Sequence, residues 1–241
     1  MQRRATISRR GVLTALVAMV LAGACSDTPG DKPTGSRPAA GAPTAAPAAV
    51  GPDLARPRVV VLGDSLTAGY GLERSQSYPA LLQERVERAG YAFEVVNMGV
   101  SGDTSAGGVR RADWALEGDV RILILALGAN DALRGLPPSA LQENLGTIID
   151  RARARGAAVL LCGMEAPPNF GAAHTEAFRQ VYRRLAREKE VEFLPFLLEG
   201  VAAAPALNQG DGIHPNAAGA RHIAELIWPR LEPMLKAAAR P

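Results

Sequence analysis

The distribution of hydrophobic residues predicts alternating strands and helices from residue 58 onward. In residues 78–89, apolar residues at positions 81, 82 and 86 alternate with charged ones and Gly90 follows, which is typical of an amphipathic helix. Further helical stretches are expected over residues 138–155, 175–189 and 216–235. Short continuous apolar runs, typical of strands buried on both faces of a sheet, occupy residues 58–62, 93–98, 121–127, 157–163 and 191–194.

Five strands that alternate with helices predict an α/β fold, a three-layer α/β/α sandwich built on a five-stranded parallel sheet. Residues 58–241 number 184, a size that suits a single domain. In such sheets, functional residues gather at the carboxyl ends of the strands. We therefore expect the residues that follow Leu62, Met98 and Leu127 to converge on one site.

The first 25 residues have the pattern of an export signal. Four arginines precede an apolar run over residues 11–24, and this run is shorter than the roughly 20 residues that a membrane-spanning helix needs. Residues 8–13 resemble a twin-arginine signal, and residues 21–25 resemble the lipobox of bacterial lipoproteins. We expect an exported protein of the periplasm or cell envelope, lipidated at Cys25; the alternative is a leader that is simply cleaved near Cys25.

Residues 26–57 are mainly Ala, Pro, Gly and Thr, with seven prolines and almost no large apolar side chain. Such a composition cannot bury enough apolar surface to fold, so we expect a disordered linker. If Cys25 is lipidated, this linker tethers the domain of residues 58–241 to a membrane. If the leader is only cleaved, it is a spacer without an anchor.

The charge balance excludes one large class of partners. The chain has 27 Lys and Arg against 24 Asp and Glu, a net charge of +3, but the leader alone holds four of the arginines. Without the leader the balance is 23 to 24, which lacks the basic excess of nucleic-acid binders. The only cysteines are Cys25 and Cys162, and there are three histidines, so we expect neither a disulfide framework nor a metal site.

Four short blocks carry the candidate chemistry: residues 63–69 (GDSLTAG), 99–104 (GVSGDT), 127–131 (LGAND) and 211–215 (DGIHP). A serine hydroxyl becomes a good nucleophile only when a base accepts its proton and a third group fixes the tautomer of that base. Ser65 lies on a glycine-flanked turn between a strand and a helix, which can expose its hydroxyl. In this order and spacing, the four blocks resemble the GDSL, or SGNH, hydrolases, most closely the bacterial thioesterase I, lysophospholipase and arylesterase group.

The resemblance covers residues 58–241 and implies the flavodoxin-like fold of these hydrolases. It also implies a catalytic triad of Ser65, Asp211 and His214, and an oxyanion hole formed by the N–H groups of Ser65 and Gly102 and the side-chain amide of Asn130. The residue types suit these roles, since glycine lets the main chain approach a substrate and an amide donates hydrogen bonds without a charge. No cofactor is expected, because a triad and an oxyanion hole suffice for ester hydrolysis.

Other polar residues have plainer interpretations. Gly102 also suits an ordinary turn, and neither Ser77 nor Ser101 lies on a glycine-flanked turn directly after a buried strand. The serine block lacks the GxSxG pattern of α/β-hydrolases, and the nearby glycines form no dinucleotide or phosphate loop. The remaining candidates are expected to be structural: Asp64 and Asp131 as loop supports, His174 and His222 as solvated surface residues, and Cys162 as core packing.

The resemblance extends to the loops at residues 131–135 and 164–171, and it implies substrate contacts from Leu133, Arg134 and Phe170. With no long insertion to form a lid, we expect a shallow, open site for a small-molecule ester or thioester of short to medium chain length, or a lysophospholipid. Two alternatives stay open: a carbohydrate O-deacetylase on the same fold, and a non-catalytic binding lipoprotein of the envelope. We expect a monomer whose membrane contact is its lipid anchor.

Overall fold

The computed structural model describes residues 56–239. The predictions for the leader, for Cys25 and for all but the last two residues of the linker lie outside the described residues. Within residues 56–239, none of the helices combines the length and the apolar composition that crossing a membrane requires.

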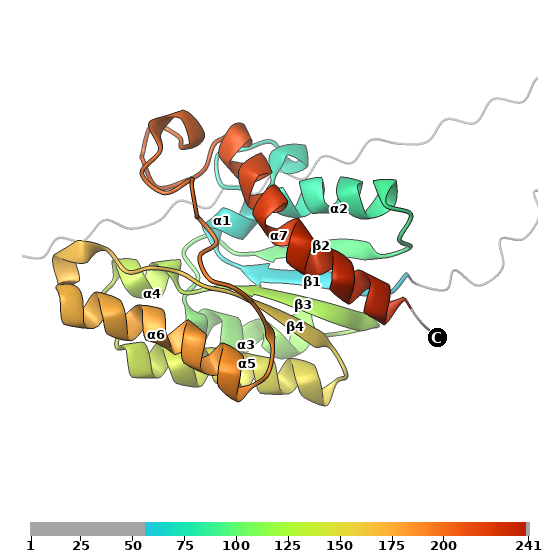
Figure 1. Ribbon diagram of the computed structural model, residues 1–241, viewed down its shortest axis with the longest axis horizontal. Helices are drawn as coiled ribbons and strands as arrows, with labels where there is room; N and C mark the ends of the chain where they lie inside the picture. The colour runs from blue at the N-terminus through green and yellow to red at the C-terminus, as the bar shows by residue number, and fades with distance from the viewer. Residues whose placement is uncertain (1–55, 240–241) are drawn as a thin grey trace, which may run out of the picture. The chain divides into compact units, whose positions relative to one another are not determined.

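A five-stranded parallel sheet forms the centre of the molecule (Figure 1). In the order β2-β1-β3-β4-β5, its strands pair in parallel throughout. All five predicted strands are present, and their ends differ from the predicted ends by at most one residue. They are β1 (Arg58–Gly63), β2 (Glu94–Gly99), β3 (Val120–Ala126), β4 (Ala158–Cys162) and β5 (Glu192–Leu194).

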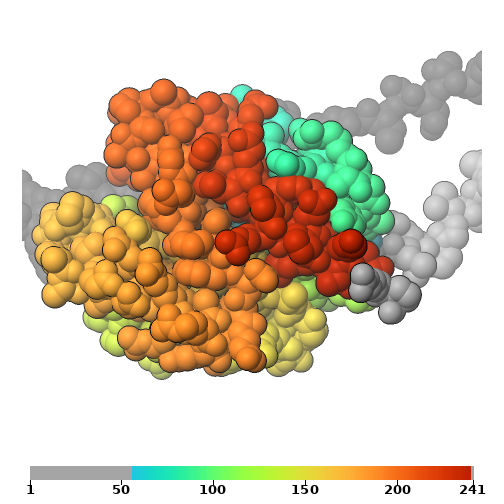
Figure 2. Space-filling view, viewed as in Figure 1, coloured from blue at the N-terminus to red at the C-terminus, as the bar shows by residue number. Residues whose placement is uncertain are grey.

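Helices cover both faces of the sheet, which confirms the three-layer prediction (Figure 1). One face carries α2 (Tyr78–Arg88) and α7 (Ala217–Ala238), which pack against each other. Along the other face lie α3 (Ser105–Ala115), α5 (Pro138–Ala154) and α6 (Ala172–Glu188). In the space-filling view, α7 crosses its face beside α2 without a gap (Figure 2). Of these helices, only α3 was not predicted from the sequence.

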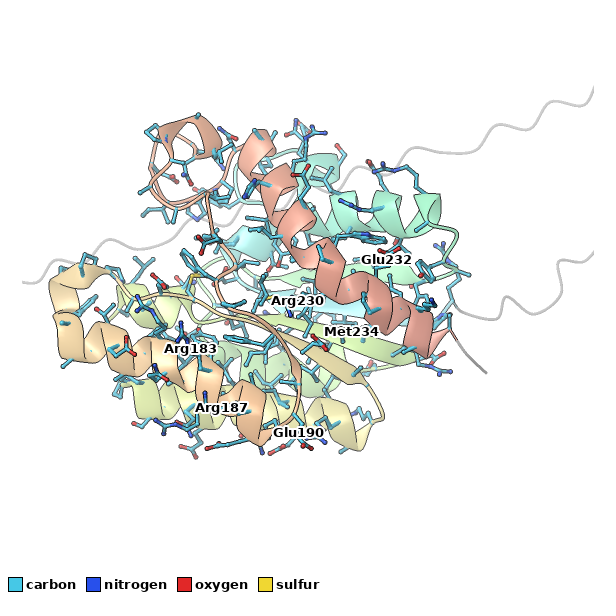
Figure 3. The ribbon with its side chains drawn as sticks, viewed as in Figure 1. Arg183, Arg187, Glu190, Arg230, Glu232 and Met234 are labelled. Carbon is cyan, nitrogen blue, oxygen red and sulfur yellow. The ribbon has the colours of Figure 1, made fainter. Side chains whose placement is uncertain are left out.

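The outer helices show why amphipathic segments settle on an apolar sheet. On α6, Tyr182 and Leu185 are buried, whereas Arg183 and Arg187 point outward (Figure 3). The strands supply the facing apolar surface, because β1 and β3 contribute nearly continuous buried runs. The core therefore lies in two layers, one on each side of the sheet.

Short helices gather at the carboxyl edge of the sheet. Directly after β1 comes α1 (Ser65–Ala68), and α4 (Ala129–Leu133) follows β3. Three 3-10 turns complete the connections: η1 (Arg74–Gln76), η2 (Pro168–Phe170) and η3 (Pro205–Leu207). The predicted convergence of residues after Leu62, Met98 and Leu127 is confirmed, because these segments line one cavity.

Candidate active site

Ser65 begins a helix of a single turn immediately after β1. Before it, the side chain of Asp64 caps this turn by accepting a hydrogen bond from the Leu66 N–H at 3.0 Å. Behind it, Gly69 adopts a left-handed conformation (φ +74°) that ends the helix, where glycine has no steric cost. This sharp turn places Ser65 at the carboxyl edge of the sheet, where it lines the cavity.

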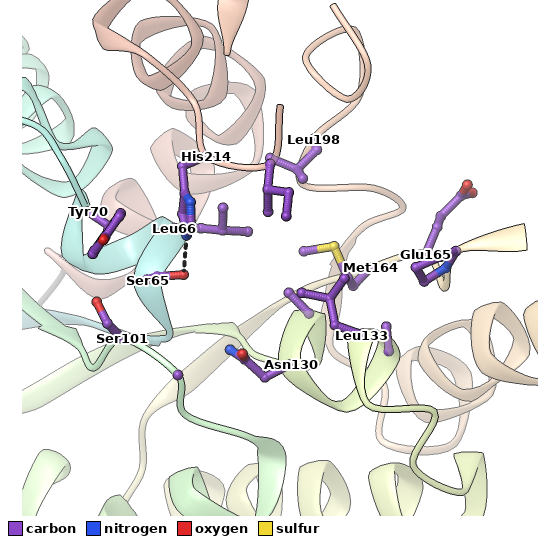
Figure 4. Close-up of a pocket in the computed structure, with 15 residues that line it drawn as sticks. Ser65, Leu66, Tyr70, Ser101, Asn130, Leu133, Met164, Glu165, Leu198 and His214 are labelled. Atoms are coloured by element: carbon purple, nitrogen blue, oxygen red, sulfur yellow. Dashed lines mark hydrogen bonds between the residues drawn. The ribbon is translucent and has the colours of Figure 1, made fainter. Parts of the chain in front are cut away.

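His214 reaches Ser65 from the other end of the chain. Its Nε2 lies 3.0 Å from Ser65 Oγ (Figure 4). Its Nδ1 lies 2.6 Å from Asp211 Oδ2. The second carboxylate oxygen, Asp211 Oδ1, accepts hydrogen bonds from the backbone N–H groups of Ile213 and His214. The aspartate, the imidazole and the hydroxyl thus form one continuous hydrogen-bonded chain.

The same hydrogen bonds stabilise the charge on Asp211. Those from the His214 backbone, the His214 ring and the Ile213 backbone lower the pKa of this carboxyl from 3.8 to about 2. Asp211 therefore stays ionised across the neutral range. A permanent negative charge at Nδ1 keeps the proton on that nitrogen and leaves Nε2 free to accept the Ser65 proton.

Hydrogen-bond donors line the opposite side of Ser65. Gly102 lies in the loop after β2 with a left-handed φ of +81°, and both Gly102 and Asn130 line the cavity that holds Ser65. One N–H of the Asn130 amide binds the Asp103 carbonyl oxygen at 2.9 Å. Because an amide nitrogen carries two N–H groups, the second is available to a substrate oxygen.

A buried carboxylate joins the two segments that carry these donors. Asp131, beside Asn130 in α4, accepts hydrogen bonds from both the N–H and the hydroxyl of Ser105, the first residue of α3. Asn144 on α5 donates to the same hydroxyl at 2.9 Å. These contacts fix the Gly102 loop relative to Asn130, as donors aimed at a developing charge require.

An ion pair anchors the Gly102 loop on the sheet itself. Arg111 binds the Asp103 carboxylate at 2.6 Å and donates to the carbonyl oxygens of Met98 and Gly63, each at 2.7 Å. Its side chain is only 15% exposed. One guanidinium therefore ties the ends of β1 and β2 to the Gly102 loop, which follows β2.

The cavity beside the serine is mostly apolar. It has a volume of about 360 Å³, with Ser65 and His214 on one wall. Leu133, Met164 and Leu198 lie across from them (Figure 4). The full set of lining residues is Ser65, Leu66, Tyr70, Ser101, Gly102, Ala129, Asn130, Ala132, Leu133, Met164, Glu165, Pro167, Leu198, Ile213 and His214. An acyl chain bound here would lie between a nucleophile and an apolar wall.

Comparison with known sequences agrees with this geometry. The profile of the GDSL-like Lipase/Acylhydrolase family matches residues 61–222, which include Ser65 and His214. The chain belongs to this family. It is a hydrolase that acts on ester bonds.

Named relatives of this GDSL-like hydrolase are bacterial. Esterase TesA of Pseudomonas aeruginosa is 45% identical over 178 residues, which cover 73% of this chain and 89% of TesA. Thioesterase 1/protease 1/lysophospholipase L1 of Escherichia coli K12 is 38% identical over 178 residues, covering 73% and 84%. The crystal structure of TesA superposes with a TM-score of 0.71 at 44% identity, covering 73% of this chain and 99% of that one.

The structure brings together most of the residues singled out in the sequence. Leu133 lines the cavity, as do Ser65, Gly102, Asn130 and His214, and Asp211 contacts His214 directly. Arg134 and Phe170 are not among the lining residues. Arg134 donates to the Gly102 carbonyl oxygen at 2.9 Å, and the Phe170 ring packs against Gly135.

Asp64, Asp131 and Cys162 have the structural surroundings expected for them. Asp64 accepts a hydrogen bond from the Leu66 N–H in the turn beside it, and Asp131 accepts one from the Ser105 N–H at the start of α3. Cys162 is 1% exposed, and burial raises the pKa of its thiol to about 12, so it carries no reactive thiolate.

The expectation for the remaining histidines was wrong. His174 and His222 are half-buried rather than solvated. The His174 ring lies between those of Phe170 and Phe178, with centroids 5.5 and 6.3 Å away, and His222 packs against Gly200. His174 is covered by one ring from η2 and one from its own helix α6, and His222 by the segment around Gly200.

Sequence reasoning missed two residues beside His214. The Tyr70 ring lies 4.7 Å from the imidazole of His214, and Gln209 donates to the carbonyl oxygen of Tyr70. Tyr70 stands between Gly69 and Gly71 directly after the serine block, a signal of a close approach that the sequence did offer. Within residues 56–239, no group of three or more His, Cys, Asp or Glu side chains is arranged to hold a metal ion.

Proposed function

We propose that this ester hydrolase works through an acyl-enzyme formed on Ser65. His214 accepts the Ser65 proton as the hydroxyl oxygen attacks the carbonyl carbon, and the new tetrahedral oxyanion binds the N–H groups of Ser65, Gly102 and Asn130. Collapse expels the alcohol or thiol, which takes the proton from His214. Water then attacks the acyl-enzyme by the same route and releases the acid. The observation that carries the proposal is the continuous chain from Asp211 through His214 to Ser65.

The substrate class follows from the wall that faces Ser65. The cavity wall is mainly apolar, with Leu66, Leu133, Met164 and Leu198 among its side chains, and its volume of about 360 Å³ suits an acyl chain of short to medium length. We propose carboxylic esters, thioesters or lysophospholipids of that chain length as substrates. The names of the relatives, esterase and thioesterase/lysophospholipase, support this class. A sugar O-deacetylase would call for a more polar wall.

The first experiment measures hydrolysis of p-nitrophenyl esters from acetate to palmitate, and of lysophosphatidylcholine, by the full chain. We expect an optimum at intermediate chain length and a loss of at least 10³-fold in kcat for Ser65→Ala. The matched control is Ser75→Ala, a hydroxyl deletion outside the cavity that should leave kcat unchanged. Activity confined to acetate would favour the deacetylase, and full activity in Ser65→Ala would refute the mechanism.

We further propose that the protein acts as an exported lipoprotein anchored through Cys25. The support is the sequence alone: the arginines, the apolar run of residues 11–24, and a lipobox-like ending at Cys25. We propose a monomer, because one chain supplies the nucleophile, the base and the hydrogen-bond donors. Size-exclusion chromatography with light scattering tests this, and a stable dimer would contradict it.

A further inference from the structure

One side chain bridges the two segments that carry the serine and the histidine. Ser65 and His214 are 149 residues apart in sequence, so their 3.0 Å contact depends on how the two segments are joined. Gln209 donates from Nε2 to the Tyr70 carbonyl oxygen at 2.7 Å, on the segment that follows Ser65. The same nitrogen donates to the Pro215 carbonyl oxygen at 2.9 Å, next to His214. Its backbone N–H binds the His214 carbonyl oxygen at 2.8 Å.

The chemistry of these contacts suits glutamine. Both partners of the side chain are carbonyl oxygens, and the N–H₂ group of glutamine has two donors, one for each. The approach is close, because a Cβ on Gly71 would lie 2.2 Å from Gln209 Oε1. Gly71 also has a φ of +76°, a conformation that glycine adopts at no cost. The chain thus provides the space for Gln209 as well as its acceptors.

The other hydrogen bonds that anchor the histidine loop, residues 208–215, lie on the side away from Ser65. Asn208 and Pro215 form an antiparallel bridge at its base. Asn208 donates to the carbonyl oxygens of Val201 and Ala204, on the segment before η3. Asn216 caps α7 and binds the carbonyl oxygen of Ala206. These bonds fix the base of the loop on α7 and η3, and Gln209 is the residue that extends the anchoring to Tyr70.

Tyr70, whose backbone Gln209 binds, also contacts the imidazole of His214. Its ring lies 4.7 Å from the His214 ring, tilted by 39°. Tyr70 is 55% exposed, so its own burial does little to hold it in place. Gln209 fixes the Tyr70 backbone, and the ring then lies against one face of the imidazole.

We propose that Gln209 is a positioning residue that sets the distance between Ser65 Oγ and His214 Nε2. This inference rests on the proposed function, because it assigns Gln209 to the proton transfer between those two atoms. Gln209 is not among the residues that line the cavity, so its effect belongs to the chemical step rather than to substrate binding. A misplacement of about 1 Å in a reacting group costs on the order of 10²-fold in rate.

The test is Gln209→Met in the full chain, which keeps the length of the side chain and removes both donors. We expect kcat to fall about 10- to 100-fold, with KM changed by less than about twofold. Labelling of Ser65 by a fluorophosphonate should slow by a similar factor. If Gln209→Met does not fold, Gln209→Glu serves instead, because a carboxylate of the same size cannot donate to the carbonyl oxygens.

Gln83→Met is the matched control. The Gln83 amide, on α2, binds Glu87, the Phe93 carbonyl oxygen and the Val95 N–H, away from the cavity. Its loss should lower the melting temperature and leave kcat unchanged. An unchanged kcat in Gln209→Met, or an equal fall of kcat in Gln83→Met, would overturn the inference.

A double variant separates positioning from general stability. Because Gln209 acts through the imidazole, adding Gln209→Met to His214→Ala should cause no further loss of kcat. A further 10- to 100-fold loss in that background would overturn the inference. Failure of the proposed function has a different signature, since Ser65→Ala would then retain activity whatever Gln209→Met does.

Discussion

At the scale of single residues, the carboxyl of Asp64 combines a capping role with an unfavourable burial. It lies directly before Ser65, is fully buried, and uses one oxygen to cap α1 while its Oδ2 has no hydrogen-bond partner. Burial raises the pKa of Asp64 from 3.8 to about 6. The protein therefore buries an ionisable carboxyl next to Ser65 at a cost in stability.

Asp64→Asn tests this cost through its pH dependence. Because the folded state binds the Asp64 proton more tightly than the unfolded state, wild-type stability falls as pH rises from about 4 to 6 and stays lower above 6. Asparagine keeps the capping oxygen and does not titrate. We expect the free energy of unfolding of the variant, relative to wild type, to improve by about 2 kcal/mol between pH 4 and pH 8 in urea denaturation.

Asp211→Asn is the control for that measurement, because the pKa shift of Asp211 has the opposite sign. Its carboxyl, lowered to about 2, contributes stability that is present above pH 3.8 and lost as pH falls toward 2. Its difference from wild type should therefore change little between pH 4 and pH 8. Equal pH dependence of the two variants would refute the account of Asp64.

At the scale of elements, two glycines inside helices have opposite surroundings. Gly219, in the first turn of α7, packs on the backbone of η3, and a Cβ there would lie 2.2 Å from the Leu207 carbonyl oxygen. Gly146, within α5, has only ordinary space around it, since its Cβ would lie 3.6 Å from Leu185. The close contact lets α7 start directly beside the segment that leads into the histidine loop.

Alanine at these two positions should therefore change stability in opposite directions. An exposed or uncrowded glycine in a helix is less favourable than alanine by about 1 kcal/mol, so Gly146→Ala should stabilise the protein by about 0.5–1 kcal/mol. Gly219→Ala should destabilise it by about 1–3 kcal/mol, because backbone must move to admit the methyl group. Thermal or urea unfolding of both variants decides this; stabilisation by Gly219→Ala would contradict the packing.

The helix α3 shows where sequence patterns stop being informative. Its sequence contains Gly107 and Gly108, which weaken both helix propensity and the apolar pattern. The structure explains them by close approach: a Cβ on Gly107 would meet Asp103, and one on Gly108 would meet Leu127. The start of the helix is fixed by Asp131, from a distant part of the chain. Strands, in contrast, were predictable because each is a local run of apolar residues.

The site also contains residues that a local sequence pattern predicts and residues that it does not. Ser65, Asp211 and His214 belong to short blocks whose order in the sequence is informative, so they were predictable. Gln209 acts through a backbone carbonyl oxygen 139 residues away, and no local pattern encodes such a partner. Arg134 lay in a predicted substrate loop, yet in the structure its guanidinium binds the Gly102 carbonyl oxygen.

At the scale of the whole molecule, the active site and the entry of the chain lie at opposite edges of the sheet. Residue 56 leads into the amino end of β1, whereas Ser65 follows its carboxyl end. Six residues of strand separate the two edges by about 20 Å. A lipid on Cys25 would thus hold the domain by the edge that lacks the cavity, and anchoring and catalysis should be separable.

Two variants of the full chain, produced with export, test this separation. Cys25→Ala should move the protein from the membrane fraction to the soluble exported fraction and leave kcat/KM for a soluble p-nitrophenyl ester unchanged, because the chain joins the sheet at the edge opposite the cavity. Ser65→Ala should abolish hydrolysis and fractionate with membranes like the wild type. Wild-type protein found wholly in the soluble exported fraction would show that the leader is simply cleaved. A fall of kcat/KM in folded Cys25→Ala would show instead that the anchored edge communicates with the site.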